Sequence, residues 1–307
     1  MTYVMGIDGG GSTVRVLVVT PDLQVIGEAK GSTSNPNLVG REVAKQTIQS
    51  TVREAVAAAH LTTDQIASVG IGIAGGEASH SEAWLREVVA GVTPHAEIVP
   101  SGDHEIALVG AHGQRKGILV LSGTGSLACG VGSTGDYVVI GARGYLLGDE
   151  GSGYWIGMEG LKAAIRDDDG RGRHTKLTNL FLEKFGLPNV EAIVPWLYHT
   201  GISRTKEIAT FAGAVLDQSE YGDLVAADIV LRAAEELALA ARAVNYRLRM
   251  EALPVAYAGG LLAFANPLSL KLCELLGLSE LPQPRYAPAI GGAILALYKL
   301  GLNLPTP

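Results

Sequence analysis

The fold of this chain is decided by a glycine-rich segment near its start, Met5-Gly6-Ile7-Asp8-Gly9-Gly10-Gly11-Ser12-Thr13, which continues into Val14-Arg15-Val16-Leu17-Val18-Val19. Two apolar, β-branched runs joined by a short glycine turn are typical of a β-hairpin. Glycines permit positive φ and carry no Cβ, so backbone N–H groups can close around an anion, and Ser12 and Thr13 add hydroxyl donors. Asp8 is suited to hold a phosphate-bound Mg²⁺ through water, because Mg²⁺ keeps most of its hydration shell. The segment therefore predicts either a plain tight hairpin or a phosphate-binding loop.

The composition of the chain limits its class and its partners. It has 307 residues, 47% of them hydrophobic and 18% charged, which is enough for two domains with sizeable cores. Its formal net charge of −7 argues against nucleic acid or an anionic membrane as the main partner. The two distant cysteines, Cys129 and Cys273, argue against a disulfide framework, a cysteine zinc site and a CxxC redox motif.

The N-terminus and the longest apolar helix indicate where the protein resides. The first residues lack a basic segment followed by an apolar one, so no signal peptide is expected. The helix predicted at 233–244 contains Glu235, Glu236 and Arg242, which do not suit a membrane span. We therefore expect a cytoplasmic protein.

The first hundred residues predict one α/β domain. A third antiparallel strand is expected after Pro21-Asp22, a pair typical of turns. Beyond it, the apolar spacing predicts alternating helices and strands. Three antiparallel strands followed by this alternation indicate a mixed sheet. The expected elements are strands at 24–29, 67–74 and 96–99 and helices at 41–60, 81–89 and 106–110.

A second round of the same pattern starts at residue 117. A strand at 117–121 ends in Ser122-Gly123-Thr124-Gly125-Ser126, returns at 127–131, and is followed by a third strand at 137–140. This repetition indicates an approximate internal duplication. A short polar loop near 111–116 separates the rounds, which predicts domains at 1–112 and 113–307. The later elements are expected as helices at 153–165, 176–185, 190–199, 205–216, 223–249 and 269–276, a strand at 254–258, and a last helix from 288.

Four glycine-containing motifs occur in an order that is more specific than any one of them. They are Asp8-Gly-Gly-Gly-Ser-Thr, Gly123-Thr-Gly-Ser, Ala258-Gly-Gly and Pro288-Ala-Ile-Gly-Gly-Ala. The series resembles the ATP site of the actin, Hsp70 and sugar-kinase superfamily. The resemblance covers essentially the whole chain. It implies an α/β fold of two duplicated ribonuclease H-like domains, each supplying one phosphate-binding hairpin to a nucleotide cleft between them.

The same resemblance implies the residues that contact ATP. Asp8 would place Mg²⁺, the two hairpins would contact phosphates, and residues 258–260 would lie against adenosine. The last helix, at about 288–301, is expected at the domain interface, where Gly291, Gly292 and Ala293 allow close packing; ordinary helix packing explains these small residues equally well. The implied nucleotide-binding set is Asp8, Gly9, Gly10, Gly11, Ser12, Thr13, Gly123, Thr124, Gly125, Ser126, Gly213, Ala258, Gly259 and Gly260.

Within the superfamily, a longer stretch is more specific: Leu147-Gly148-Asp149-Glu150-Gly151-Ser152-Gly153-Tyr154-Trp155-Ile156-Gly157. It resembles the N-acetylglucosamine kinase and glucosamine kinase branch of the BadF/BadG/BcrA/BcrD ATPase family, as do Ser34-Asn35 and Asp103. The resemblance implies that Asn35 and Asp149 bind sugar hydroxyls, to which an amide and a carboxylate can each make two hydrogen bonds. It also implies that Asp103 contacts the substrate as the general base. Each aspartate is also compatible with an N-cap of the helix that follows it, and for Asp103 the two roles are compatible, because a helix N-terminus keeps a carboxylate ionised.

One position departs from the pattern of that branch. Ala142-Arg143-Gly144 stands where the eukaryotic N-acetylglucosamine kinases carry Gly-Trp-Gly. Arg143 and Gly144 are therefore expected at the substrate, with a charge near the acyl or lactyl side of the sugar. Glucosamine, N-acetylglucosamine and N-acetylmuramic acid all stay open as substrates.

Three other interpretations fit the sequence less well. The ATP-driven activators of 2-hydroxyacyl-CoA dehydratases, in the same family, share an iron–sulfur cluster through paired cysteines, which the two cysteines here do not match. A non-enzymatic, nucleotide-gated module of the actin or Hsp70 type would need neither a base nor sugar ligands. The stretch Gly70-Ile71-Gly72-Ile73-Ala74-Gly75 matches the dinucleotide fingerprint, but its apolar alternation predicts the strand itself rather than the turn after it.

The sequence therefore predicts an ATP- and Mg²⁺-dependent kinase that phosphorylates an amino sugar at a primary hydroxyl. The expected partners are the sugar and ATP, without nucleic acid or membrane. The family resemblance suggests a homodimer.

Overall fold

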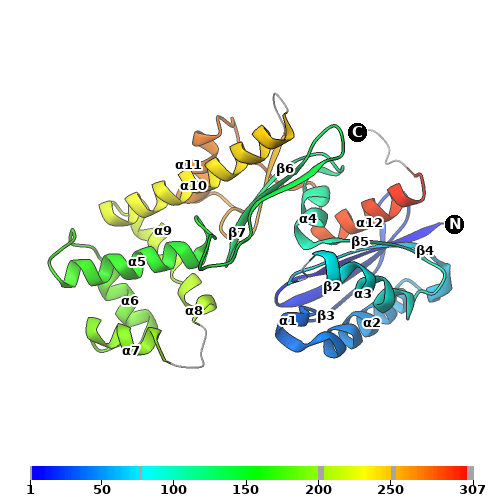
Figure 1. The fold of residues 1–307 in the computed structure, drawn as a ribbon, viewed down its shortest axis with the longest axis horizontal. Helices are drawn as coiled ribbons and strands as arrows, with labels where there is room; N and C mark the ends of the chain where they lie inside the picture. The colour runs from blue at the N-terminus through cyan, green and yellow to red at the C-terminus, as the bar shows by residue number, and fades with distance from the viewer. Residues whose placement is uncertain (1, 76–77, 200–203, 250–253, 303–307) are drawn as a thin grey trace. The chain divides into compact units, whose positions relative to one another are not determined.

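The computed structural model describes residues 2–75, 78–199, 204–249 and 254–302. The chain forms two compact units (Figure 1). The first comprises residues 1–117, 133–135 and 284–307, and the second comprises 118–132 and 136–283. Both are mixed α/β units, as the sequence predicts.

The first unit is built on a five-stranded sheet in the order β3-β2-β1-β4-β5. Strand β1 pairs antiparallel with β2, which pairs antiparallel with β3. Strand β4 lies parallel to β1, and β5 lies parallel to β4. This is the mixed sheet predicted from the sequence. The strands are β1 (Tyr3–Gly9), β2 (Thr13–Val19), β3 (Val25–Ser32), β4 (Ile66–Ile73) and β5 (Glu97–Gly102).

Helices cover both faces of this sheet (Figure 1). On one face, β1 contributes Met5 and Ile7 to a buried cluster with Ile48 and Val52 of α2 and Leu85 of α3. On the other face lie α4 and α12, which pack against each other and against β1 and β4. The helices of this unit are α1 (Pro36–Val39), α2 (Arg41–Ala58), α3 (Ala78–Ala90), α4 (Asp103–His112) and α12 (Pro288–Lys299), with a 3₁₀ turn at Thr63–Gln65.

The last helix belongs to the first unit because glycines let backbones touch. A Cβ on Gly6 would lie 1.7 Å from the carbonyl oxygen of Ala289, and one on Gly70 would lie 1.9 Å from that of Gly292. A Cβ on Gly291 would lie 1.9 Å from the carbonyl oxygen of Ile106 in α4. The sequence predicts that all of 113–307 lies in a second domain; the structure instead groups residues 284–302 with the first unit.

The second unit repeats the strand pattern in a four-stranded sheet of order β8-β7-β6-β9. Strand β9 lies parallel to β6, and β8 lies antiparallel to β7. Helix α10 runs along the core of this unit and buries nine residues, among them Ala233, Leu237 and Ala241. The strands are β6 (Gly117–Ser122), β7 (Ser126–Val131), β8 (Tyr137–Gly141) and β9 (Val255–Ala258).

The helices of the second unit follow the predicted order, with two interruptions. The expected helix at 205–216 divides at Thr210 and Phe211, and the one at 190–199 begins as a 3₁₀ turn. Among the described residues, no helix has the length and apolar content needed to cross a bilayer. The elements are α5 (Gly153–Asp168), α6 (Leu177–Phe185), the 3₁₀ turn Val190–Ala192, α7 (Ile193–Leu197), α8 (Thr205–Ala209), α9 (Ala212–Glu220), α10 (Leu224–Leu248) and α11 (Pro267–Leu275).

Candidate active site

The first glycine segment forms the predicted hairpin between β1 and β2. Gly9 pairs with Val14 across the two strands, and Gly11, Ser12 and Thr13 at the turn are exposed. None of the three glycines has a positive φ, so they contribute space rather than unusual backbone torsion. A Cβ on Gly11 would meet nothing within 4 Å. The turn is therefore open to a ligand on that side.

Gly9 is needed for packing inside the unit. A Cβ there would lie 2.5 Å from the hydroxyl oxygen of Ser34 and 2.5 Å from a methyl carbon of Ile73. Ser34 is fully buried, and its Oγ has no hydrogen-bond partner among the described residues. This contact joins the Ser34-Asn35 segment to the first hairpin, a link that the sequence alone does not reveal.

Asp8 and Asp103 lie at the same edge of the first sheet. In the register of the parallel strands, Gly9 pairs with Ile73, and Ile73 pairs with Gly102. Asp8 directly precedes this row and Asp103 directly follows it. The carboxyl ends of parallel strands form the usual ligand edge of an open α/β sheet.

Asp8 carries an unusual carboxylate. Its pKa is raised to about 6, first by burial and second by the charge of Asp103, with Arg15 acting in the opposite direction. Two neighbouring carboxylates that repel each other favour a bound cation. No cluster of three or more His, Cys, Asp or Glu side chains forms among the described residues.

Asp103 is the first residue of α4, one position later than a cap. The N-cap is Gly102, which makes no side-chain cap bond. The His104 backbone N–H donates to Asp103 Oδ1 at 2.9 Å, and His104 Nδ1 lies 3.0 Å from the same oxygen. Asp103 Oδ2 accepts no hydrogen bond from the described residues. One carboxylate oxygen is thus held in place, and the other is available.

Asn35 is the N-cap of α1, and it also packs against β4's end. Its Oδ1 accepts from the Asn37 N–H at 2.9 Å. A Cβ on Gly75, which has φ of +79°, would lie 2.3 Å from this same oxygen. The cap uses the carbonyl side of the amide, so the Nδ2 donors remain for a ligand.

The second glycine hairpin, between β6 and β7, is braced by the start of α5. Gly153 N–H donates to the Gly123 carbonyl at 2.8 Å, and Tyr154 N–H donates to the Thr124 carbonyl at 3.3 Å. Serines at the two strand ends bind the loop that precedes α5. Ser122 Oγ donates to the Gly151 carbonyl at 2.8 Å, and Ser126 Oγ donates to the Glu150 carbonyl at 2.7 Å. Both serine hydroxyls therefore hold this hairpin to the loop that precedes α5.

Asp149 lies against this hairpin and is not the cap of α5. The N-cap is Ser152, whose Oγ accepts from the Trp155 N–H at 3.1 Å. Asp149 has φ of +61°, and its Oδ1 accepts from the Ser126 N–H at 3.3 Å. Burial raises the pKa of its carboxyl; the Ser126 N–H lowers it, and Glu150 raises it further. Asp149 therefore combines a left-handed backbone conformation with a partly buried carboxylate, as is common for residues that bind a ligand.

The residues expected at adenosine lie beside the second hairpin. Ala258 pairs with Leu121, so β9 ends next to Ser122. Gly259, at φ of +86°, approaches so closely that a Cβ would lie 2.2 Å from the Ser122 carbonyl oxygen, whereas Gly260 faces open space. Gly213 lies on an exposed face of α9, and a Cβ there would meet nothing within 4 Å; no contact among the described residues joins it to the hairpin.

Arg143 and Gly144 lie in the exposed loop between β8 and Asp149. A Cβ on Gly148 would lie 3.4 Å from the Arg143 Cβ, so the base of the arginine side chain lies over the Gly148-Asp149 segment. Gly144 has φ of +76°. The ring of Tyr145 meets that of Tyr154 edge-on, with centroids 5.0 Å apart, which fixes this loop to the start of α5.

Residues 5–296 match the model of the BadF/BadG/BcrA/BcrD ATPase family. The chain belongs to this family. It is 34% identical over 251 residues to the N-acetylmuramic acid/N-acetylglucosamine kinase of Clostridium acetobutylicum, a match that covers 82% of each protein. It is 27% identical to the glucosamine kinase GspK of Vibrio cholerae, over 80% of this chain and 82% of that one.

A solved structure extends the likeness to the fold. A candidate N-acetylglucosamine kinase from Chromobacterium violaceum superimposes with a TM-score of 0.77 and 28% identity, covering 96% of this chain and 99% of that one. The family assignment and the two-domain, actin-like fold predicted from the sequence are thereby confirmed.

Proposed function

We propose that the chain is an ATP-dependent kinase that transfers the γ-phosphoryl group to a primary hydroxyl of an amino sugar of the N-acetylglucosamine or glucosamine type. The observation that carries this proposal is the position of Asp103, which follows β5 at the sheet edge that also holds Asp8 and the first glycine hairpin. The similarity to amino-sugar kinases over about four-fifths of the chain supports the substrate class.

In this proposal Asp103 accepts the proton of the attacking sugar hydroxyl. The His104 N–H fixes Oδ1, and we assign Oδ2 as the basic atom. Phosphoryl transfer depends mainly on positioning and charge stabilisation, so a single oriented base suffices. Asp8 would hold Mg²⁺ through water, and that ion would neutralise charge on the phosphates. Backbone N–H groups at the two glycine turns would donate to phosphate oxygens, apart from those of Gly123 and Ser126, which already donate within the protein.

Sugar binding is assigned to Asn35 and Asp149. The Asn35 Nδ2 group supplies two donors while its Oδ1 caps α1, and Asp149 supplies acceptors from a carboxylate already oriented by the Ser126 N–H. Donors and acceptors of this kind suit a polyol, whose hydroxyls both donate and accept. Arg143 lies in the same loop as Asp149. We assign it to contact the acyl or lactyl side of the sugar.

The decisive experiment is a panel of sugars assayed for ATP turnover with the full chain. Glucosamine, N-acetylglucosamine and N-acetylmuramic acid are compared with glucose and with no sugar. We expect stimulation by at least one amino sugar, with a sugar phosphate as product. ATP hydrolysis that no sugar stimulates would contradict the proposal and favour an activator or a nucleotide-gated module. Arg143→Trp should then change the preference among the sugars; an unchanged profile would remove Arg143 from the substrate.

The proposal includes Mg²⁺ dependence, a homodimer and a cytoplasmic location. Metal removal with a chelator should abolish turnover, and added Mg²⁺ should restore it. Light scattering on the purified protein tests the dimer, since a mass near 32.0 kDa would mean a monomer. Fractionation of cells tests the location.

A further inference from the structure

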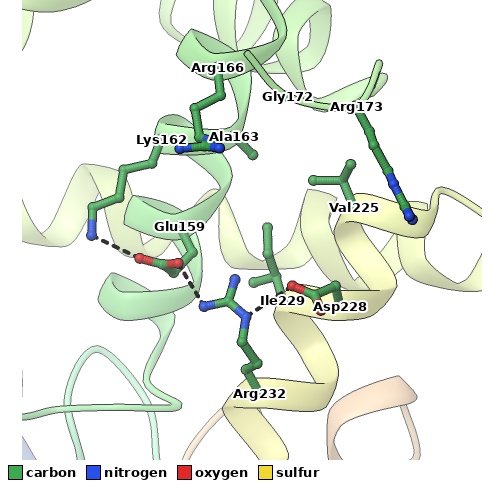
Figure 2. A pocket seen from close by; sticks show the side chains of 10 residues that line it. All are labelled: Glu159, Lys162, Ala163, Arg166, Gly172, Arg173, Val225, Asp228, Ile229 and Arg232. Carbon is green, nitrogen blue, oxygen red and sulfur yellow. Dashed lines mark hydrogen bonds and ion pairs between the residues drawn. The ribbon is translucent and has the colours of Figure 1, made fainter.

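A basic pocket lies in the second unit between α5, the loop after it and α10 (Figure 2). Its volume is about 450 Å³, within the range of small-molecule sites. The wall contains four cationic side chains and two carboxylates, a net charge of +2, on a chain whose overall charge is −7. The lining residues are Glu159, Lys162, Ala163, Arg166, Gly172, Arg173, Val225, Asp228, Ile229 and Arg232.

Both carboxylates of the pocket are already paired. Glu159 accepts from Lys162 and from Arg232, each at 2.8 Å. Arg232 also donates to Asp228 at 3.0 Å. The pKa of Glu159 is lowered despite its burial, because of these two cations. Both acids therefore already have cationic partners within the wall.

Arg166 and Arg173 supply two further cations to the wall of the pocket. Figure 2 shows their guanidinium groups on two sides of the pocket, with Val225 and Ile229 between them. Arg166 donates one bond, to the Arg171 carbonyl at 3.3 Å, which leaves most of its five N–H donors. No carboxylate pairs with Arg166 or Arg173 in the part of the chain that the structure describes.

The fold of the loop after α5 explains why Arg173 has no carboxylate partner among the described residues. The sequence there, Asp167-Asp168-Asp169-Gly170-Arg171-Gly172-Arg173, places three acids before two arginines. Asp167 accepts from Thr175 N–H and from the Thr178 hydroxyl, and Asp169 pairs with Arg171. These acids are used within the loop, so Arg173 reaches the pocket without a neutralising neighbour.

We propose that this pocket binds a phosphomonoester, with the phosphate between Arg166 and Arg173. A phosphate group carries close to two negative charges at neutral pH, which matches the net charge of the wall. Guanidinium groups bind phosphate oxygens in paired, charge-assisted hydrogen bonds. The pocket is larger than inorganic phosphate needs, and Ala163, Val225 and Ile229 offer apolar contact to an organic body. This site is separate from the residues of the proposed phosphoryl transfer and does not depend on that proposal.

The test is calorimetric titration of the full chain with phenyl phosphate and with inorganic phosphate, at constant ionic strength and pH 8. We expect saturable binding of phenyl phosphate, several-fold tighter than that of inorganic phosphate. Equal affinity for the two would overturn the phosphomonoester assignment in favour of a simple phosphate site. Absence of saturable binding of either probe would overturn the site itself.

Variants locate the binding. Arg166→Ala/Arg173→Ala should weaken phenyl phosphate at least about tenfold, the factor for losing one charge-assisted hydrogen bond. Arg166→Lys/Arg173→Lys keeps the charge without the planar fork and should fall between wild type and the alanine variant. The matched control Arg53→Ala/Arg247→Ala removes two exposed arginines elsewhere and should bind like wild type. Equal weakening by the control, or unweakened binding in the Arg166→Ala/Arg173→Ala protein, would overturn the proposal; the latter would point to the glycine hairpins.

Discussion

Asp8 and Asp103 face the same sheet edge closely enough that the charge of Asp103, after burial, is the second cause that raises the pKa of Asp8 to about 6. Two carboxylates in such a position are unfavourable for the isolated protein. The arrangement is useful only where a cation or a proton is to be bound. Functional sites are where proteins keep groups of this kind.

The first prediction is that Asp8→Asn stabilises the folded protein above pH 7. Because the folded-state pKa is raised, the folded protein binds the Asp8 proton more tightly than the unfolded chain. This group's contribution to stability therefore falls as pH rises from about 4 to 6 and stays unfavourable above that. The shift corresponds to about 1–3 kcal/mol when the partial exposure of Asp8 is taken into account.

The measurement is thermal unfolding of wild type and Asp8→Asn at pH 5 and pH 8. The melting temperature of the variant should exceed that of wild type by several degrees at pH 8 and by less at pH 5. Asp22→Asn, at an exposed turn, is the control. A variant that melts at a lower temperature than wild type at pH 8 would show that the ionised Asp8 carboxylate does not destabilise the folded protein. Loss of Mg²⁺-dependent turnover should accompany the gain in stability.

The second prediction concerns Asp103→Asn. The amide keeps the size of the side chain and can still accept from the His104 N–H, but it is not a base. We expect kcat to fall about 10²- to 10⁴-fold, the usual range for a positioned acid–base group. ATP affinity should survive, because both hairpins are intact. Single-turnover transfer and nucleotide titration measure the two effects, with Asp64→Asn as control; retained turnover, or joint loss of folding and ATP binding, would assign Asp103 a structural role.

The third prediction separates ligand binding from capping at Asn35. Asn35→Ser keeps an N-cap oxygen but removes the Nδ2 donors, and Asn35→Ala removes both. If Nδ2 contacts the sugar, both variants should raise the sugar KM, by a factor equivalent to about 1–3 kcal/mol. Only Asn35→Ala should also lower the melting temperature, by the cost of one cap. A normal KM in Asn35→Ser would leave Asn35 as a cap alone.

Asp149→Asn provides the corresponding test in the second unit. It removes the negative charge and keeps an oxygen that can accept from the Ser126 N–H. The sugar KM should rise while the ATP KM changes little, since the hairpin backbone is unaltered. Equal rises in both constants would mean that Asp149 orders the hairpin rather than binding the sugar.

The fourth prediction compares two glycines. Gly70→Ala places a methyl group 1.9 Å from the Gly292 carbonyl oxygen, so α12 must move off the sheet, at a cost of about 3 kcal/mol or more. Gly213→Ala places a methyl group in open space on α9 and should be neutral or slightly stabilising. Urea unfolding measures both. ATP titration of Gly213→Ala also tests whether that residue contacts the nucleotide; unchanged affinity would remove it from the site.

The local patterns of the sequence predicted most elements and the ends of the strands that carry the site. The hairpins at 9–13 and 122–126 and the mixed sheet in the first unit follow from glycine turns and period-two apolar runs. The domain assignment of the last helix was wrong, because it depends on contacts between residues that are distant in sequence. The position of α12 depends on the contacts of Gly6 with Ala289 and of Gly70 with Gly292. The sequence of a helix does not indicate which strands it will pack against.

In the candidate site, too, local sequence predicted which residues are involved, whereas distant contacts decide what each of them does. Asp149 and Asp103 were each compatible with a cap, and only the three-dimensional positions of Ser152 and Gly102 as the actual caps separate those roles. In the sequence, Ser34 belongs to a family motif and Ser122 and Ser126 flank the second glycine turn, but nothing there shows what their side chains contact. Their burial and carbonyl partners become visible only when the loops that meet them are placed.

The packing of α12 also has a consequence for the order in which the protein matures on the ribosome. The N-terminal sheet lacks one of its covering helices until residues 288–299 have been translated, so the second unit, lying between in sequence, can complete its own core first. Nascent chains that end before that helix would present bare glycine faces on β1 and β4. Because domains usually fold in amino-to-carboxyl order during synthesis, the packing of α12 predicts the opposite order for this chain, with the second unit complete before the first.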